Sequence, residues 1–211
     1  GTYKNKRFTI MSTGIGADNI DIVLNELDAL VNINLETKSI KEKHTALNIV
    51  RIGTSGSLQK DIPLDSFLLS TYALDINGML RSYITETISH PNIENAFVEH
   101  TNWDEKKCFP LVISNSKSLE DKISSEIIYK GITATAGGFY GPQGRVIRLP
   151  IKDSNLNNKI DSFNFNGKRV TNLEMETSAI YGLSKLLGHH ACSMNAIIAN
   201  RAHGTFSKNP D

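Results

Sequence analysis

The chain has few of the features that mark membrane, disulfide-rich or nucleic-acid-binding proteins. Its 211 residues include no apolar run near the roughly 18 residues that a membrane span needs. Cys108 and Cys192 are the only cysteines, and two distant cysteines without CxxC spacing indicate neither a disulfide framework nor a zinc site. This usage is typical of a reduced, intracellular protein, so we expect a cytoplasmic protein without a membrane partner.

An excess of charge is also missing. The chain carries 23 basic and 22 acidic residues for a net charge of +1, and no Lys/Arg cluster forms a stripe, which gives no support to nucleic-acid binding. The six histidines show no HxxxH or HxH spacing. His189 and His190 follow the end of a predicted helix, where a positive charge is favourable, so we prefer helix capping to metal binding and predict no metal site.

What the chain does contain is an alternation of strand-like and helix-like segments, without internal repeats. Strands are predicted at 7–12, 47–52, 66–71, 110–114, 131–136, 170–173 and 190–199. Helices are predicted from apolar residues spaced three and four apart, at 18–31, 119–128 and 175–187. Such an alternation indicates an α/β fold with a mostly parallel, helix-covered sheet, which we interpret as a single domain over residues 1–211.

Local signals refine this pattern in some places and leave it open in others. Asp18 is predicted to cap the first helix, and Gly188 to close the helix at 175–187. Lys4-Asn5-Lys6 indicates a tight turn, which predicts a hairpin with residues 7–12 as one of its strands. Segment 33–45 is either a helix extension or a solvated loop, and 77–100 gives mixed signals.

Arg51-Ile52-Gly53-Thr54-Ser55-Gly56 lies at the end of a predicted strand. Its glycines let the backbone approach a ligand, its hydroxyl and N–H groups donate, and Arg51 adds a fixed charge. This combination suits an oxyanion such as phosphate. The segment is not a Walker loop, because no GKS or GKT follows. The alternative is a strand-to-loop turn with a surface arginine.

Two further polar segments adjoin predicted helices. Glu174-Met175-Glu176 lies where a strand becomes a helix, so its carboxylates either bind sugar hydroxyls while Met175 packs on the ring, or only offset the helix dipole. Ser12-Thr13-Gly14-Ile15-Gly16 lacks the third glycine of a dinucleotide fingerprint, and we interpret it as a close-packed strand–helix turn that could line the same pocket. Ligands of such sheets bind beyond the carboxyl ends of strands, where these motifs fall.

Phe139-Tyr140-Gly141-Pro142-Gln143-Gly144-Arg145 is the most informative segment. Gln143 offers one acceptor and a pair of donors, and Arg145 offers five donors in a rigid fork. This pair could grip a planar ligand with alternating carbonyl and N–H groups, such as a uracil ring, while an aromatic side chain packs nearby. Arg201, which follows the last predicted strand, is by itself more typical of a surface charge.

Together, RIGTSG, FYGPQGR, NLEMET and the final Asn200-Arg201 resemble the nucleoside phosphorylase superfamily, and most closely its uridine phosphorylases, in order and spacing. The resemblance implies a three-layer α/β/α fold whose central mixed sheet is partly barrel-like. Gln143 and Arg145 match the pair that contacts uracil in uridine phosphorylases. Purine nucleoside phosphorylases of the superfamily instead have an Asp near the final strand, where this chain has Asn200-Arg201.

The same resemblance implies a role for each matching residue. Phosphate would be bound by Arg51 and Thr54, the base by Phe139, Gln143, Arg145, Ile198 and Arg201, and the ribose by Thr54, Glu174, Met175 and Glu176. The catalytic residues would be Arg51, Arg145 and Glu176. Arg145 would stabilise negative charge on the departing uracil. Glu176 is not expected to be a general base, because phosphate is already an anionic nucleophile.

The implied reaction is the reversible phosphorolysis of uridine to uracil and ribose 1-phosphate, through an oxocarbenium-like sugar. It requires no metal and no organic cofactor, since inorganic phosphate is a co-substrate. The resemblance also implies sites shared across a subunit interface, so we expect a homodimer or a hexamer built as a trimer of dimers. The alternatives are a broader or purine-directed nucleoside phosphorylase, a hydrolase that uses water, and a non-catalytic nucleoside-binding paralogue.

The chain also departs from the family pattern. Missing counterparts are the amino-terminal strand with its Gly/Arg phosphate loop, a phosphate-binding arginine and a histidine that serve the neighbouring subunit, and the carboxyl-terminal helix. Either residues 1–211 are part of a longer protein, or this form is inactive. We prefer the first interpretation, because the base and ribose positions are intact. Arg51 is therefore not expected to form the whole phosphate site.

Overall fold

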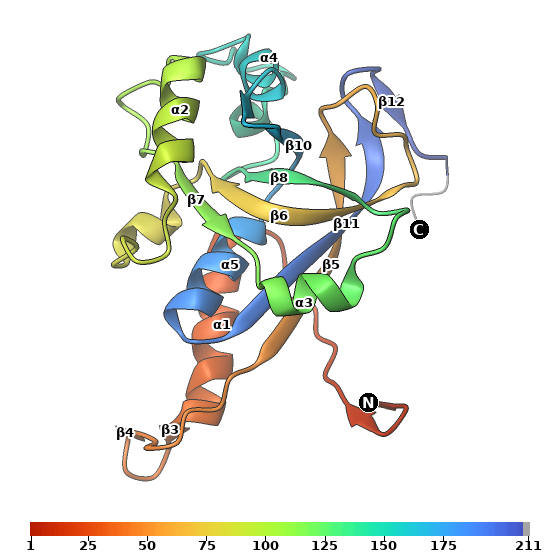
Figure 1. Cartoon of the computed structure of the whole chain (residues 1–211). Coiled ribbons are helices and arrows are strands. Elements are labelled where there is room, and N and C mark those ends of the chain that lie inside the picture. Colours follow the sequence, from red (N-terminus) through yellow and green to blue (C-terminus); the bar gives the residue numbers. More distant parts are fainter. Residues whose placement is uncertain (209–211) are drawn as a thin grey trace.

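The chain forms a mixed β-sheet that closes on itself and is covered by helices, as the computed structural model shows for residues 1–208 (Figure 1). The sheet runs in the order β12-β11-β5-β10-β8-β6-β7, with β9 beside β10. An additional pairing of β11 with β6 closes a ring of five strands: β11, β5, β10, β8 and β6. The bounds are β5 Asn48–Ser57, β6 Phe67–Asp75, β7 Leu111–Ser114, β8 Tyr129–Thr135, β9 Asn164–Phe165, β10 Lys168–Glu174, β11 His190–Asn200 and β12 Thr205–Phe206.

The ring contains both parallel and antiparallel strand pairs. β5 runs parallel to β11, and β8 runs parallel to both β6 and β10. The two groups meet through antiparallel pairs, β10 with β5 and β11 with β6. The partly barrel-like mixed sheet that the resemblance implied is therefore confirmed. Strand β5 extends past the carboxyl ends of β8 and β10, so residues Arg51–Gly56 lie near those ends.

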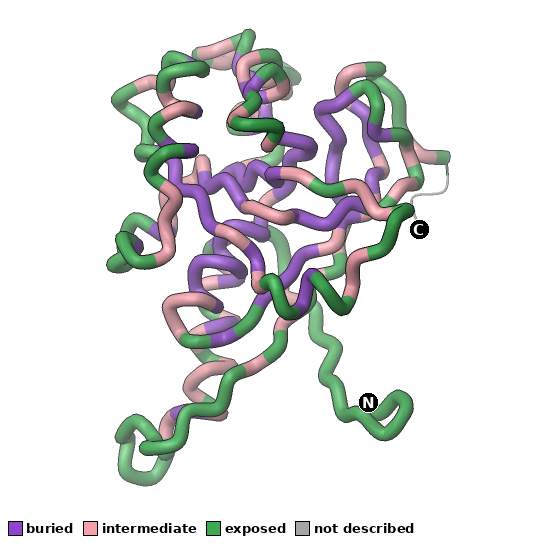
Figure 2. Tube along the Cα trace, in the orientation of Figure 1, coloured by how far each residue is buried: buried purple, intermediate pink, exposed green. Residues whose placement is uncertain are grey.

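Helices pack on two sides of the sheet, because adjacent strand residues point to opposite faces. On β6, Ala73 lies in the apolar core beneath helices α1 Ala17–Asn32 and α5 Thr177–Leu186, and Leu74 lies in the core beneath α2 Pro91–Thr101 and α4 Leu156–Asp161. A shorter helix, α3 Lys117–Ile123, packs on β11. Figure 2 shows the buried residues concentrated along these central strands and inner helix faces. The α/β/α layering is thus confirmed.

The amino-terminal prediction is correct for the turn and wrong for the strand. Thr2–Tyr3 (β1) pairs with Lys6–Arg7 (β2) in a two-stranded hairpin around Lys4 and Asn5, whose φ values of 45° and 61° suit such a turn. Residues 8–16, however, belong to no strand or helix and are mostly exposed. Alternating apolar residues were insufficient there, because no neighbouring strand in the described chain pairs with them.

Several other predictions need correction. Gly16, not Asp18, is the N-cap of α1, and Asp18 lies in its first turn. Segment 33–45 is neither helix nor plain loop, since Ile33–Asn34 (β3) and Ser39–Ile40 (β4) form a hairpin. The mixed segment 77–100 contains the 3₁₀ helix η1 Met79–Ser82 and most of α2, and a second 3₁₀ turn, η2, spans Gly141–Gln143. Helix α3 is shorter than the predicted 119–128.

Two exclusions based on composition can be compared with the structure. Cys108 is exposed and Cys192 is buried, and both are free thiols. Within residues 1–208, no helix combines the length and apolar character that crossing a membrane would require.

Candidate functional site

A cavity of about 490 Å³ opens where β5, β10 and β11 meet the loop that follows β8. It brings together the three polar motifs, which are far apart in the sequence. Nine of the ten predicted site residues line it: Arg51, Thr54, Phe139, Gln143, Arg145, Glu174, Met175, Glu176 and Ile198. The tenth, Arg201, does not line the cavity and lies behind Gln143.

Arg51 is the cation of one half of the cavity. Its Nη2 lies 2.7 Å from Glu176 Oε2 and 3.3 Å from Glu174 Oε2, and its Nη1 donates to Asn195 Oδ1 at 2.9 Å. The Arg51 side chain is only 13% exposed. A buried guanidinium between two carboxylates is well compensated, so this half of the cavity holds both signs of charge.

Glu174 mainly organises the start of helix α5. Its carboxylate accepts hydrogen bonds from the N–H groups of Glu176 and Thr177 and from the Thr135 hydroxyl, at 2.7–3.1 Å. Its side chain is 2% exposed. These bonds satisfy donors that a helix start leaves unpaired, and the helix dipole favours the negative charge. Glu174 therefore fixes the backbone that presents Met175 and Glu176.

Glu176 joins this half to the amino-terminal segment. Its Oε1 accepts from the Gly16 N–H at 2.8 Å, while Oε2 contacts Arg51. Ser12, Thr13 and Gly14 line the same cavity, so the turn at Ser12–Gly16 does contribute to the pocket. Gly16 has φ 102°, a conformation that favours glycine.

The other half of the cavity is built around the amide of Gln143, which is 2% exposed. Arg145 Nη1 donates to Gln143 Oε1 at 2.7 Å, and Arg201 donates to the same oxygen and to the Gln143 carbonyl. Two guanidinium donors leave no doubt about the amide orientation, because Nε2 is itself a donor. Within residues 1–208 no partner occupies that NH₂ group, so it is available to an acceptor in the cavity.

These two arginines share no carboxylate. Within residues 1–208 neither Arg145 nor Arg201 forms an ion pair, and the Arg145 guanidinium instead lies 3.9 Å from the Phe139 ring centre. Burial lowers the pKa of Arg145 below its ordinary value. Burial and the Arg145 charge lower the pKa of Arg201 to about 10, which still leaves it protonated at neutral pH. This half of the cavity is therefore positively charged without compensation.

Two glycines of the Arg51–Gly56 motif make room for the guanidinium groups of Arg51 and Arg201. A Cβ at Gly53 would lie 2.5 Å from Arg51 Nη1, and a Cβ at Gly56 would lie 2.9 Å from Arg201 Nε. Both distances are too short for carbon and nitrogen that are not bonded. The motif thus supports both halves of the site, and Gly56 explains how Arg201 approaches Gln143 from behind.

A larger open cavity, of about 880 Å³, lies on the other side of the loop at 139–153. Arg145 and Tyr140 border it, but the motif carboxylates and Arg51 do not. Two of its basic side chains are already paired or stacked: Lys152 with Asp104, and Lys107 over the Trp103 ring. We therefore assign the chemistry to the smaller cavity, where the polar groups converge.

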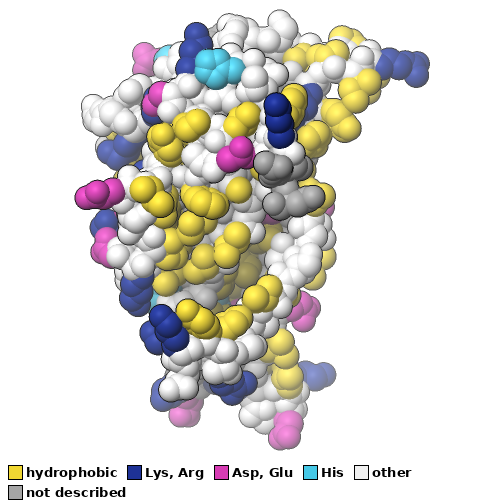
Figure 3. Space-filling view, turned by 90° about the vertical axis from the view of Figure 1, so that its right-hand side faces the viewer, with side chains coloured by type: hydrophobic (Ala, Val, Ile, Leu, Met, Phe, Trp, Pro, Cys, Tyr) yellow, Lys and Arg dark blue, Asp and Glu magenta, His cyan; other side chains and the backbone are white. Residues whose placement is uncertain are grey.

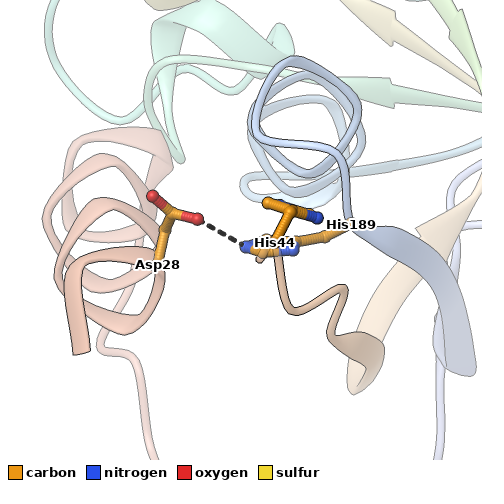
Figure 4. A group of neighbouring side chains, drawn as sticks. All are labelled: Asp28, His44 and His189. Carbon is orange, nitrogen blue, oxygen red and sulfur yellow. Dashed lines mark ion pairs between the residues drawn. The ribbon is translucent and has the colours of Figure 1, made fainter. Parts of the chain in front are cut away.

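Away from the cavity, Asp28, His44 and His189 bring side chains from three segments together (Figure 4). His189 Nε2 lies 3.2 Å from Asp28 Oδ1, and His44 stacks on the His189 ring. The Leu47 N–H donates to His189 Nδ1 at 3.2 Å, which places the proton of the neutral ring on Nε2 and leaves that nitrogen no lone pair for a metal. The group connects α1 to the starts of β5 and β11 through polar and stacking contacts.

The predicted helix-capping role of the histidines is corrected by this geometry. It is His44, not His189 or His190, whose ring nitrogen contacts the Leu187 carbonyl at the end of α5, at 2.9 Å. Histidine spacing could not indicate this group, because its members come from three separate segments. Sequence reasoning also missed Asn195, whose contact with Arg51 depends on the pairing of β11 with β5.

Comparison with known proteins agrees with this geometry. A family model described as Phosphorylase superfamily matches residues 1–210. The chain belongs to the Phosphorylase superfamily. A uridine phosphorylase of Thermococcus kodakarensis is 26% identical over 99% of the chain and 63% of its own length. A DeoD-type purine nucleoside phosphorylase of Bacillus cereus is 26% identical over 92% of the chain and 64% of its own length. The chain thus spans less than two thirds of these superfamily relatives.

Solved structures of the superfamily agree with the fold. A Trypanosoma brucei nucleoside phosphorylase, described as showing uridine phosphorylase activity, superposes with a TM-score of 0.83 and 27% identity over the whole chain and 77% of its own length. A uridine phosphorylase of Phytophthora capsici has a TM-score of 0.57 and 21% identity over 93% of the chain and 66% of its own length, which supports the fold alone.

Proposed function

We propose that this protein catalyses the reversible phosphorolysis of uridine to uracil and ribose 1-phosphate, as an enzyme of pyrimidine salvage. The observation that carries the proposal is that Gln143 lines the same cavity as Arg51 and Glu176 and is contacted by Arg145 in the cavity and by Arg201 from behind, two guanidinium groups that form no ion pair within residues 1–208. The Thermococcus relative and the Trypanosoma structure support the same activity by similarity.

In this proposal the base lies against Phe139 and Ile198, within reach of Gln143 and Arg145. The free NH₂ group of Gln143 donates to a carbonyl of the uracil ring. Arg145 keeps Nε and Nη2 for the base, because its described bonds to Gln143 and to the Phe139 carbonyl both use Nη1. Arg201 acts from behind, by holding the Gln143 amide in the orientation that presents those donors.

The ribose and phosphate would occupy the other half of the cavity. Glu176 accepts hydrogen bonds from ribose hydroxyls, and Met175 packs on the sugar. Arg51 and Thr54 bind phosphate, which then attacks C1′ as the bond to the base breaks. Arg51 also offsets Glu176 at 2.7 Å, so a carboxylate can stand beside an anionic nucleophile without strong repulsion.

Charge stabilisation is the main catalytic effect in this scheme. As the glycosidic bond breaks, the uracil ring gains negative charge. Arg145 and the nearby Arg201 are already charged and already in place, so they stabilise this charge more than they stabilise the neutral substrate. The scheme requires no metal and no organic cofactor, and a cytoplasmic location stays a prediction.

A second candidate is a broader or purine-directed nucleoside phosphorylase. The similarity to DeoD-type purine enzymes, at the same 26% identity as the uridine phosphorylase, is the observation that favours it. The base half of the cavity argues for uracil instead, because Gln143 and Arg145 line it, Arg201 holds Gln143 from behind, and no carboxylate within residues 1–208 pairs with either arginine.

We also propose that the protein acts as a homodimer or as a hexamer built as a trimer of dimers. Large apolar side chains gather on the face of Figure 3, and Val50, Ile52 and Phe206, in strands β5 and β12, are 43%, 85% and 74% exposed. Exposed apolar surface of this kind marks an association site. Ile52 and Phe206 also line the cavity, so a second copy there would help to enclose the bound nucleoside.

The direct test is an assay of the protein at its full natural length for release of free base from uridine, thymidine, inosine and adenosine, with and without phosphate. We expect phosphate-dependent release of uracil from uridine. Release of purines without uracil would support the second candidate. Equal release without phosphate would identify a hydrolase, and tight nucleoside binding without release would identify a non-catalytic paralogue.

A further inference from the structure

Buried polar side chains form a continuous series of hydrogen bonds around the inside of the barrel, which we call the ring although it runs from Arg51 to Ser55 without a bond between those two residues. Arg51 Nη1 donates to Asn195 Oδ1 at 2.9 Å, and Asn195 Nδ2 donates to Ser70 Oγ at 3.1 Å. Ser70 Oγ lies 2.5 Å from Thr133 Oγ1, and Thr133 Oγ1 donates to Asn172 Oδ1 at 2.8 Å. Asn172 Nδ2 then donates to Ser55 Oγ at 2.9 Å.

Each strand of the closed ring supplies a member. Asn195 is on β11, Ser70 on β6, Thr133 on β8 and Asn172 on β10, and all four are 0% exposed. Both ends of the ring, Arg51 and Ser55, lie on β5 within the motif at Arg51–Gly56. A barrel of this size fills its interior with side chains, and apolar ones would fill it at no hydrogen-bonding cost. A complete polar layer at this level of the barrel therefore indicates a role beyond filling the interior.

The direction of the hydrogen bonds in the ring is set by Arg51 at one end and by the Asn172 amide near the other. A guanidinium can only donate, so the Asn195 oxygen must face it and the Asn195 NH₂ must face Ser70. Thr133 spends its single hydrogen on the Asn172 oxygen, so Ser70 must donate to Thr133. The Asn172 NH₂ then donates to Ser55 Oγ.

The last member of the ring is left with a free hydrogen. Ser55 Oγ accepts from Asn172, and its own O–H has no acceptor within residues 1–208. Ser55 also lines the cavity. The series of donors that begins at the guanidinium thus ends at a hydroxyl that is free to donate into the cavity. In the low dielectric of a barrel interior, such aligned bonds strengthen one another.

We propose that this ring presets the phosphate-binding segment, with Asn195 as the positioning residue for Arg51 and Ser55 as a further donor to the bound anion. The inference rests on the proposed function in that Arg51 contacts phosphate. It extends that function, because Ser70, Thr133 and Asn172 would affect anion binding without touching the anion. Asn195 directs the Nη1 of Arg51 toward the barrel, which leaves the rest of the fork for Glu176 and the ligand.

The test is calorimetric titration of inorganic phosphate into the full-length protein. Asn195→Ala should raise the Kd for phosphate about tenfold, which corresponds to about 1.4 kcal/mol. Thr133→Val keeps the side-chain shape and interrupts the ring at its midpoint, so it should raise the Kd by a smaller factor, about threefold. It also tests the proposal should Asn195→Ala fail to fold. Asn32→Ala, which removes a buried Asn far from the cavity, should leave the Kd unchanged.

A double-mutant comparison separates positioning from general loss of structure. If Asn195 acts through Arg51, Asn195→Ala should add no further loss of phosphate affinity to an Arg51→Ala protein. Additive losses, an unchanged Kd in both Asn195→Ala and Thr133→Val, or no phosphate binding by the wild type would each overturn the inference. Uridine turnover is measured separately. Phosphate binding that depends on Asn195 without uridine turnover would refute only the proposed function.

Discussion

In the half of the cavity that we propose to bind phosphate and ribose, Arg51 lies 2.7 Å from Glu176 and 3.3 Å from Glu174. In the proposed base half, Arg145 and Arg201 converge on Gln143 with no carboxylate within residues 1–208. One half is balanced in charge and the other is not. Under the proposed function, the balanced half would accept a sugar that becomes positive and a phosphate that is negative. The unbalanced half would accept a base that becomes negative.

This difference indicates which half of the cavity stabilises the transition state most relative to the bound substrate. A cation already neutralised by two carboxylates changes its interaction energy little during the reaction. A cation without a counter-charge interacts more favourably as the base becomes anionic, which is the difference that accelerates a reaction. We therefore expect loss of Arg145 to lower kcat most, and substitutions elsewhere around the cavity to change substrate binding as well.

The largest effect is expected from Arg145→Ala. Loss of a preorganised donor to developing negative charge should lower kcat on uridine about 10²- to 10³-fold. Steady-state kinetics on uridine at saturating phosphate measures it. Arg145→Lys is the matched control, since it keeps the charge and loses the planar fork, and it should recover part of the rate. Near-normal kinetics of Arg145→Ala would remove its proposed role.

A smaller loss is expected from Glu176→Gln. The substitution removes the negative charge beside Arg51 and replaces one acceptor oxygen with an NH₂ donor, which weakens both the pairing with Arg51 and the proposed bonds to ribose hydroxyls. Hydrogen bonds to charged groups contribute about 1.5–3 kcal/mol, or roughly 10- to 150-fold in kcat/KM for uridine. Glu26→Gln, on the exposed side of α1, is the control. An unchanged KM for uridine, with only kcat lowered, would argue against ribose binding by Glu176.

Two glycine substitutions test the two halves of the cavity separately. Gly53→Ala places a methyl 2.5 Å from Arg51 Nη1, and Gly56→Ala places one 2.9 Å from Arg201 Nε. We expect each to cost about 1 kcal/mol, or roughly fivefold in affinity. The first should raise the KM for phosphate and the second the KM for uridine. Each variant serves as the control for the other, and equal effects on both substrates would contradict the division.

The smallest effect concerns stability, far from the cavity. Burial lowers the pKa of His189, a shift that His44 and His190 reinforce and that the Asp28 carboxylate opposes. As pH falls below about 6.5, the unfolded chain binds a proton that the folded His189 does not, so stability should be lost down through the lowered pKa. Urea midpoints between pH 7 and pH 5 should fall less in His189→Gln than in the wild type. The exposed His203→Gln should keep the wild-type slope.

Sequence reasoning was strongest where the chemistry lay within a short segment. Gln143 with Arg145, or Met175 with Glu176, carries its own signal, and these segments do meet in one cavity. Arg201 shows the limit of such reasoning. Its motif indicated a residue of the base pocket, but only the structure places it behind Gln143, in the space that Gly56 leaves.

What the sequence could not predict depends on contacts between distant strands. Ser70, Thr133, Asn172 and Asn195 look like ordinary polar residues in strands, and they form a ring only because β11 also pairs with β6. The strand predicted at 7–12 failed for the converse reason. Its alternation of apolar residues was present, but no neighbouring strand of the described chain provides hydrogen bonds for it.

The central claim is that the uncompensated base half stabilises negative charge on the departing base. The most direct measurement compares kcat/KM of wild type and Arg145→Ala on uridine and on 5-fluorouridine, whose electron-poor base leaves more easily. Because a better leaving group needs less stabilisation, we predict that Arg145→Ala loses much less activity on 5-fluorouridine than on uridine. Equal losses on the two substrates would show that Arg145 only binds the base, and would contradict the claim.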